Sequence, residues 1–306
     1  MLIRFMLLIF LLLQTHAAFA AELHREVFPL ERNGIRLHLA RYLADGPEDT
    51  TPLLMVHGLT YSSHEFDVDY ADYSLVRFFA DNGYAVWLLD IAGYGSSQEV
   101  GDGFLPDSDY AAEDIAAAAK LITEISKTKK LDVLGWSWGT VTSGRFAARY
   151  PELVDRLVLY APIVAGLASM DVSAPFNKNT WAHAAGDFQV KPDKSIDYDI
   201  VEPPVAATFL SNCWRYDGEG SPNGGRRDLL VDPQERLIPA ASLQSSTLLI
   251  VGTKDEYVTV DLCKEALETL PEGSRLEVIE GGGHAMMMEK PHYKNFRNRV
   301  IDFLKK

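Results

Sequence analysis

Residues 131–139 read LDVLGWSWG, and they predict a strand that turns sharply at a serine into a helix. The first four residues form an apolar, strand-like run, and an amphipathic helix pattern follows over residues 140–150. Gly135 and Gly139 stand two residues before and two residues after Ser137, in the pattern G-x-S-x-G. A turn this tight needs glycine, because only a missing side chain lets the chain close against its neighbours. We therefore expect Ser137 to be raised out of a sheet as a nucleophile.

An acid and a histidine follow later in the chain, each after a predicted strand. Residues 246–251 read STLLIV, a strand pattern that ends shortly before Asp255. Residues 275–280 alternate as a strand does, and they run into three glycines and His284. In these places Asp255 can orient His284, and His284 can take the proton of Ser137. The predicted catalytic residues are therefore Ser137, Asp255 and His284.

Nearby residues offer alternatives to two of these assignments. Glu256 and Asp261 are other carboxylates in the same region, but Asp255 is preferred because it directly follows the strand and its turn glycine. His292 lies eight residues after His284, inside the pattern of the final helix. We interpret His292 as a surface or packing histidine.

The chain resembles the α/β-hydrolase fold superfamily over nearly everything after its leader. Residues 53–59, LLMVHGL, resemble the family's strand that ends in a His-Gly oxyanion loop. Residues 88–97, LLDIAGYGSS, resemble its strand and loop with the pattern D-x-x-G-x-G-x-S. The predicted elbow itself places the N–H of Trp138 at a helix N-terminus, where it can donate to a developing oxyanion. The resemblance implies that the N–H of Leu59 is the second oxyanion donor and that His57 has a structural role.

The expected fold class is α/β, the α/β-hydrolase fold, with a mostly parallel and doubly covered sheet. Apolar strand patterns alternate with helical ones along most of the chain. This alternation breaks between the sixth and seventh predicted strands, where the resemblance implies an inserted cap. Within that insertion, residues 218–225 (GEGSPNGG) predict a mobile loop. The expected organisation is a signal peptide over 1–20, a hydrolase core over 21–162 and 242–306, and a cap over 163–241.

Tryptophans are candidates to line the substrate pocket. Trp136 flanks the predicted nucleophile, and Trp181 and Trp214 lie in the expected cap. Trp136 is an equally good candidate for packing against the neighbouring strand, whereas for each cap tryptophan the cap's own core is the favoured interpretation. The other cap aromatics, for which the cap core is likewise favoured over the pocket, are Phe176, Phe188, Phe209 and Tyr216.

The N-terminus has the features of a secretory signal peptide. Arg4 precedes an apolar run over residues 5–13, and Ala-Phe-Ala at 18–20 supplies a small-residue cleavage site. The apolar run is short for a membrane span, so no stable membrane anchor is expected after cleavage. We predict cleavage after Ala20 and export to the periplasm or the exterior of a bacterial cell.

Composition limits the classes of partner. The chain has 306 residues and a formal net charge of −14, which becomes −15 when the leader and its Arg4 are removed. Such a charge argues against nucleic acid and anionic membranes as partners. Cys213 and Cys263 would survive cleavage, either as a disulfide or as two buried thiols. No Cys/His cluster has metal spacing and no glycine loop is suited to phosphate, so neither a metal nor a cofactor is expected.

A serine nucleophile with backbone oxyanion donors favours acyl transfer. We expect hydrolysis of a small to medium carboxylic ester, a small-molecule substrate. A serine at the elbow weighs against family members similar to epoxide hydrolases and haloalkane dehalogenases, which use aspartate there. Prolyl-type aminopeptidases resemble the chain at the elbow, but their oxyanion loop is HGGPG, whereas residues 57–61 read HGLTY. Lactone hydrolysis, carbon–carbon bond hydrolysis and a non-catalytic binding protein on the same fold are the remaining alternatives.

Overall fold

The computed structural model describes residues 22–45, 50–167, 170 and 172–305. The predicted signal peptide over residues 1–20 lies outside the described residues. Among the helices of the described ranges, none is both long enough and apolar enough to cross a membrane.

The centre of the protein is an eight-stranded sheet with the order β1-β2-β4-β3-β5-β6-β9-β10. It begins as an antiparallel hairpin of β1 (Leu23–Arg32) and β2 (Ile35–Ala44). Asn33 and Gly34 both have positive φ values, 53° and 76°, as a tight two-residue hairpin turn requires. The other six strands run parallel to one another: β3 (Thr51–Val56), β4 (Tyr84–Asp90), β5 (Leu131–Trp136), β6 (Val154–Tyr160), β9 (Ser246–Gly252) and β10 (Arg275–Ile279).

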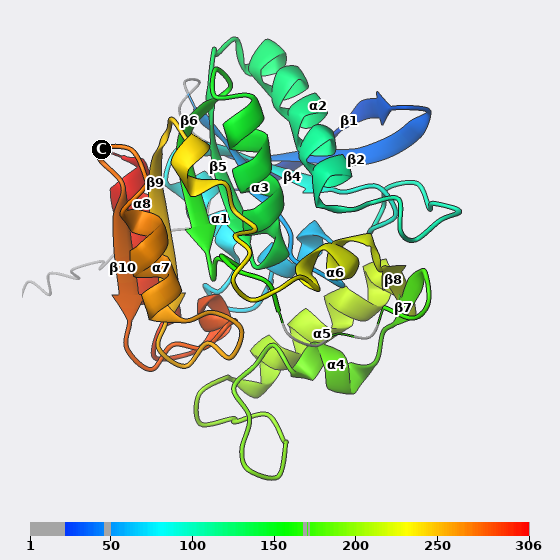
Figure 1. The fold of residues 1–306 in the computed structure, drawn as a ribbon, viewed down its shortest axis with the longest axis vertical. Coiled ribbons are helices and arrows are strands. Elements are labelled where there is room, and N and C mark those ends of the chain that lie inside the picture. Colours follow the sequence, from blue (N-terminus) through cyan, green and yellow to red (C-terminus); the bar gives the residue numbers. More distant parts are fainter. Residues whose placement is uncertain (1–21, 46–49, 168–169, 171, 306) are drawn as a thin grey trace, which may run out of the picture.

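Helices cover both faces of the sheet, which explains why the central strands are largely apolar. The helices of the core are α1 (Leu75–Asp81), α2 (Ser108–Ser126), α3 (Trp138–Arg149), α7 (Val260–Leu267) and α8 (Tyr293–Leu304). In Figure 1, α2, α3 and α7 lie in front of the sheet and α1 lies behind it. The ring of Tyr293 in α8 stacks on Tyr73 just before α1, with ring centroids 4.0 Å apart, so α8 lies beside α1. Every residue of β4 and β5 is buried. The predicted fold class, a mostly parallel and doubly covered sheet, is confirmed.

A separate group of elements lies between β6 and β9, at the carboxyl ends of the parallel strands (Figure 1). We call the segment from residue 163 to 241 the cap. It contains β7 (Phe176–Lys178), α4 (Trp181–Ala185), α5 (Pro203–Asp217), β8 (Gly220–Pro222) and α6 (Gly224–Leu229). Short 3₁₀ helices complete the chain at Ser63–Phe66, Ala240–Ser242 and Met286–Met288. The carboxyl edge of a parallel sheet is where α/β proteins place their ligands, so the cap covers the expected site.

The prediction of a mobile loop over residues 218–225 is wrong. Part of this segment is β8, which pairs with β7, and Gly224 and Gly225 begin α6. A Cβ on Gly224 would lie 2.6 Å from the Pro106 carbonyl oxygen, and one on Gly225 would lie 2.6 Å from the Trp138 ring. These glycines therefore serve close packing of the cap against the core, not mobility.

One carboxylate fastens the cap to the core. Asp217, the last residue of α5, accepts hydrogen bonds from the N–H of Ser62 (2.9 Å), the hydroxyl of Ser62 (3.0 Å) and the N–H of Gly95 (3.0 Å). Burial raises the pKa of Asp217 to about 7. Cys213 and Cys263 do not add a covalent link, because both are free, buried thiols. The disulfide alternative is therefore wrong.

Candidate active site

Ser137 occupies a strained turn between β5 and α3. Its backbone has φ 55° and ψ −121°, a conformation that residues other than glycine rarely adopt. The Ser137 N–H donates to the Tyr160 carbonyl (3.0 Å), and the Thr140 hydroxyl donates to the Ser137 carbonyl (2.5 Å). These contacts with the next strand and the following helix hold the strained turn in place.

The glycines on either side of Ser137 are required by close backbone contacts. A Cβ on Gly135 would lie 2.3 Å from the Gly139 carbonyl oxygen, and a Cβ on Gly139 would lie 2.3 Å from the Val56 carbonyl oxygen. Val56 pairs with Gly135 across the sheet, so the loop after β3 lies beside the turn after β5. The spacing of the G-x-S-x-G pattern thus follows from the packing of three segments.

Asp255 and His284 meet at the ends of two neighbouring strands. Asp255 Oδ2 lies 2.9 Å from His284 Nδ1. The other carboxylate oxygen, Oδ1, accepts from the N–H of Tyr257 (2.9 Å) and of Val258 (3.1 Å). Of the three candidate carboxylates, Asp255 is the one that lies within hydrogen-bonding distance of His284. The alternative acids point elsewhere: Glu256 is exposed, and Asp261 is exposed and pairs with Lys264 at 2.8 Å.

Electrostatics favour the charged form of His284. Burial of the ring disfavours a charge, but the charge and hydrogen bond of Asp255 and the charge of Asp187 outweigh burial. The pKa of His284 is therefore raised above its ordinary value. A histidine in this environment accepts a proton readily and is stabilised once it holds it.

Ser137 and His284 line one cavity of about 70 Å³. Its apolar lining residues are Leu59, Ile163, Leu167, Met170 and Leu229. Its other polar lining residues are Thr60, His183, Asp187, Arg226 and Tyr257. Convergent polar groups beside an apolar wall make this cavity a candidate ligand site, although it is small for one.

A family model described as alpha/beta hydrolase fold matches residues 51–291. The chain belongs to the alpha/beta hydrolase fold family. It is 24% identical to an uncharacterized carboxylesterase of Bacillus subtilis over 85% of this chain and 81% of that protein. It is also 24% identical to carboxylesterase YbfK of the same organism, over 86% of this chain and 83% of that protein. Among solved structures, an esterase from Exiguobacterium antarcticum matches with a TM-score of 0.65 and 18% identity, over 91% of this chain and 99% of that one.

The predicted oxyanion donors of this alpha/beta hydrolase are both available. Among the described residues, neither the Leu59 N–H nor the Trp138 N–H donates to a protein acceptor. The loop that carries Leu59 is held by His57, whose Nδ1–H donates to the Gly58 carbonyl (2.8 Å) and whose Nε2 accepts from the Ile91 N–H (3.1 Å). Burial lowers the pKa of His57, which favours this neutral ring. His57 therefore shapes the loop and faces no reacting group.

The tryptophans proposed for the pocket of this hydrolase lie elsewhere. Trp136 is buried, stacks on Tyr160 with centroids 5.8 Å apart, and donates its indole N–H to the His284 carbonyl (3.2 Å). Trp181 and Trp214 stack on each other at 5.1 Å, and Trp181 is 48% exposed. None of the three lines the cavity that holds Ser137. Trp136 instead packs in the core against Tyr160, and the two cap tryptophans pack against each other.

Sequence reasoning missed the polar residues that the cap contributes. Asp187 and Arg226 come from the cap, and His183 lies on the short helix α4. Tyr257 follows Asp255 closely and packs edge-on against His284, with ring centroids 4.8 Å apart. No motif surrounds these residues, so only the folded chain brings them to Ser137.

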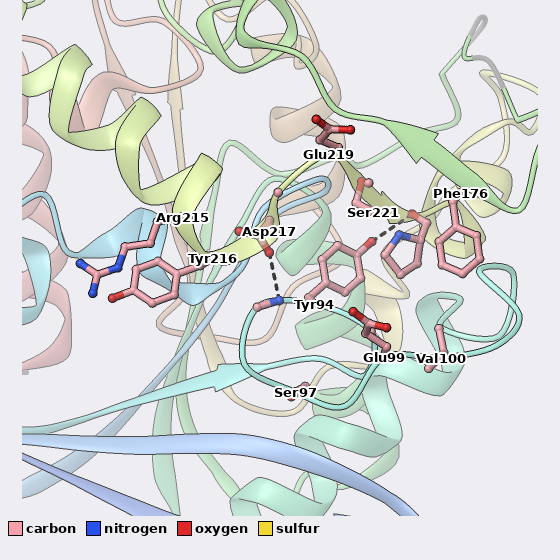
Figure 2. A pocket seen from close by; sticks show the side chains of 15 residues that line it. Tyr94, Ser97, Glu99, Val100, Phe176, Arg215, Tyr216, Asp217, Glu219 and Ser221 are labelled. Atoms are coloured by element: carbon pink, nitrogen blue, oxygen red, sulfur yellow. Dashed lines mark hydrogen bonds between the residues drawn. The ribbon is translucent and has the colours of Figure 1, made fainter.

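A larger cavity, of about 520 Å³, lies outside the candidate site (Figure 2). It is formed by the loop over residues 93–100 and by the end of α5 with β8. Figure 2 shows Asp217 bonded to the N–H of Gly95, and the Tyr94 hydroxyl directed at the Pro222 carbonyl (3.3 Å). None of Ser137, Asp255 and His284 lines it, so its size does not make it the active site.

Possible metal ligands gather at one place within the described ranges. Glu22, His24 and Asp45 bring three ligand atoms within 4.8 Å of one another at the edge of the sheet. All three are exposed, and His24 pairs with Asp45 at 2.7 Å. None of them lines the cavity of Ser137, and the chemistry proposed below uses none of them.

Proposed function

We propose that this chain is a serine hydrolase that cleaves a carboxylic ester of small to medium size through an acyl-enzyme. One observation supports this most: a strained, cavity-lining Ser137 shares its cavity with His284, which is bonded to the buried carboxylate of Asp255. The similarity to two Bacillus carboxylesterases and to an esterase structure supports the same reaction class.

In the proposed mechanism, His284 Nε2 takes the proton of Ser137 as the hydroxyl oxygen attacks the ester carbonyl carbon. Asp255 fixes the tautomer through Nδ1 and stabilises the imidazolium. The N–H groups of Leu59 and Trp138 stabilise the negative charge on the carbonyl oxygen. The carbon–oxygen bond to the alcohol then breaks, and His284 protonates the leaving alkoxide. Water releases the acyl group by the same steps, with the Ser137 oxygen as the leaving group.

The size of the cavity favours short substrates. About 70 Å³ beside Ser137 accommodates only a few non-hydrogen atoms, and its apolar wall suits a short acyl or alkyl chain. The oxyanion loop differs from the HGGPG of prolyl-type aminopeptidases, which disfavours the peptidase alternative. Export through a cleaved signal peptide over residues 1–20 remains our proposal for the location, with a mature chain that starts at Ala21.

A fluorophosphonate tests the proposal directly, because it forms a bond only with an activated serine. We expect the protein to gain the mass of one phosphonyl group and the modified peptide to contain Ser137. The Ser137→Ala variant, folded to the same extent by circular dichroism, should not react. A folded wild-type protein that remains unlabelled would support the non-catalytic alternative.

A further inference from the structure

A buried cation that forms no ion pair with any described residue lies in the same cavity as Ser137. Arg226, on α6, is only 3% exposed, and a guanidinium is always protonated in proteins. Arginine is rarely buried this deeply unless it is paired with an anion. Among the residues that the structure describes, no carboxylate forms an ion pair with Arg226.

The hydrogen bonds of Arg226 leave part of its guanidinium unused. Its Nη1 donates to the Ser221 hydroxyl (3.3 Å), the Pro222 carbonyl (3.3 Å) and the Asn223 side-chain oxygen (3.2 Å). Its Nη2 donates to the Thr60 hydroxyl. All these acceptors are neutral. The Nε–H and the second hydrogen on Nη2 have no acceptor in the described part of the chain.

The position of Arg226 brings its charge close to the predicted reaction centre. Thr60, which accepts its hydrogen bond, directly follows Leu59, the proposed oxyanion donor. The contacts to residues 221–223 fix the other end of the guanidinium to the cap. The charge is thus held rigidly at the wall of a cavity whose small volume permits only a short spacer to the scissile bond.

From these observations we propose that Arg226 is an anion subsite and that the substrate is a short ester carrying a carboxylate group. This inference rests on the proposed ester hydrolysis and specifies its substrate class. The free N–H groups of Arg226 would bind the substrate carboxylate, since arginine and carboxylate form strong charge-assisted hydrogen bonds. The carboxylate would thereby give the guanidinium the directly bonded anion that it lacks among the described residues.

One other charged cap residue, Asp187, lines the cavity and bears on this inference. Its carboxylate makes no hydrogen bond or ion pair within the described ranges, and burial raises its pKa to about 6. The nearby positive charges of His284 and Arg226 act in the opposite direction. Asp187 keeps some solvent-exposed area, whereas Arg226 is 3% exposed, and no hydrogen bond from a described residue orders the Asp187 carboxylate. Arg226 is therefore the better-organised binding group. Recognition of a cationic ester by Asp187 is the competing outcome that the test must separate.

The test compares matched esters that differ by one charge. Monomethyl succinate and methyl butyrate differ in a carboxylate on the acyl side, and acetoxyacetate and ethyl acetate differ in one on the alcohol side. We expect the wild-type protein to favour the charged member of at least one pair in kcat/KM by roughly 10- to 100-fold, the range of one or two hydrogen bonds to a charged group. The pair that shows the preference identifies the side on which the carboxylate lies.

Variants assign that preference to Arg226. In Arg226→Gln the charged-to-neutral ratio should fall to about one, and Arg226→Lys should retain part of the preference. The ratio is the readout because damage to the oxyanion loop lowers both rates together. The matched control is Arg227→Gln, since Arg227 is exposed and its guanidinium lies over Phe104 instead of the cavity. It removes the same charge and should leave the ratio unchanged. Asp187→Asn removes a negative charge from the cavity, so it should raise the charged-to-neutral ratio of kcat/KM.

A second measurement covers the case in which Arg226→Gln does not fold. With wild-type protein, succinate should inhibit ester turnover more strongly than the neutral succinamide. Equal inhibition, or an unchanged charged-to-neutral ratio in folded Arg226→Gln, would overturn the inference. A preference for choline esters that is lost in Asp187→Asn would also overturn it, because Asp187 and not Arg226 would then determine the charge selectivity. If Ser137 reacts with the phosphonate but no short ester is hydrolysed, the inference fails while the serine hydrolase survives. An unreactive Ser137 would remove both.

Discussion

The hydroxyl of Tyr160 donates a hydrogen bond of 2.7 Å to the backbone carbonyl of His284. Tyr160 is the last residue of β6, and its oxygen also accepts from the Met287 N–H at 3.2 Å. Trp136 donates to the same His284 carbonyl. The glycine-rich turn that presents His284 is therefore positioned by the rigid end of the central sheet.

Removing that hydroxyl should misplace His284 without destroying the fold. For Tyr160→Phe we expect kcat/KM on a short ester to fall about tenfold and the free energy of unfolding to fall by about 1–2 kcal/mol. Urea denaturation and initial rates measure the two effects. Tyr150→Phe is the control, because it also removes a hydroxyl bonded to another residue, Glu113, but lies away from the site. If both variants keep wild-type rates, Tyr160 does not position His284.

The carboxylate of Asp255 should be essential for rate and not for folding. In Asp255→Asn the amide cannot accept the Nδ1–H of His284 in the same way, so the wrong tautomer is favoured and kcat should fall roughly 10²- to 10⁴-fold. The neighbouring Asp261→Asn, an exposed carboxylate paired with Lys264, is the control and should keep wild-type rates. Wild-type kcat in Asp255→Asn would remove this residue from the mechanism.

The pH dependence of kcat/KM should report the environment of His284. Only neutral His284 can take a proton, so activity should fall as the pH drops through its raised pKa. The negative charges of Asp255 and Asp187 both raise this pKa. The positively charged Arg226 also lines the cavity and stays unchanged in the comparison below. Replacing Asp187 by asparagine removes a negative charge, so the acid limb should move to lower pH. An acid limb that stays fixed or moves upward in Asp187→Asn would show that this charge does not act on His284.

The contact between the cap and the core should depend on Asp217 in a pH-dependent way. Asp217→Ala leaves the buried N–H groups of Ser62 and Gly95 without their acceptor, which should lower the free energy of unfolding by about 2 kcal/mol. The native pKa of Asp217, about 7, exceeds the unfolded value, so the native state binds its proton more tightly. The stability that this group contributes is complete below the unfolded pKa and declines as the pH rises to about 7.

Urea denaturation at pH 5 and pH 8 measures this difference. The destabilisation by Asp217→Ala should be larger at pH 5 than at pH 8. The exposed neighbour Glu219 offers the control, since Glu219→Ala should change stability little at either pH. A destabilisation by Asp217→Ala that grows with pH would contradict the raised native pKa.

The residues after the strands of the core could be predicted from the sequence because their signals are local. The glycines at 135 and 139, the turn before Asp255 and the glycine run before His284 each encode one sharp turn at the end of an apolar strand. A parallel sheet then brings these turns to one edge without further information. This rule predicts an acid beside His284, and Asp255 is the carboxylate that lies within hydrogen-bonding distance of the His284 ring.

The cap could not be predicted in the same way, because its residues reach the site through packing between distant segments. Nothing in the sequence around Arg226 shows that it will meet Thr60, which lies far away in the chain. Glycines at 224 and 225 indicated mobility, whereas the fold uses them for close contact with the core. The place of Trp136 beside the nucleophile suggested a pocket wall, but stacking on Tyr160 takes its ring into the core.

The central claim is that Ser137 hydrolyses esters, and initial rates on a matched substrate panel test it most directly. The panel contains nitrophenyl esters from acetate to laurate and the nitroanilides of proline and alanine. The account predicts turnover of the short esters, little turnover of the long ones, and loss of this activity in Ser137→Ala. Ester turnover that persists in Ser137→Ala, or turnover of the anilides alone, would contradict it.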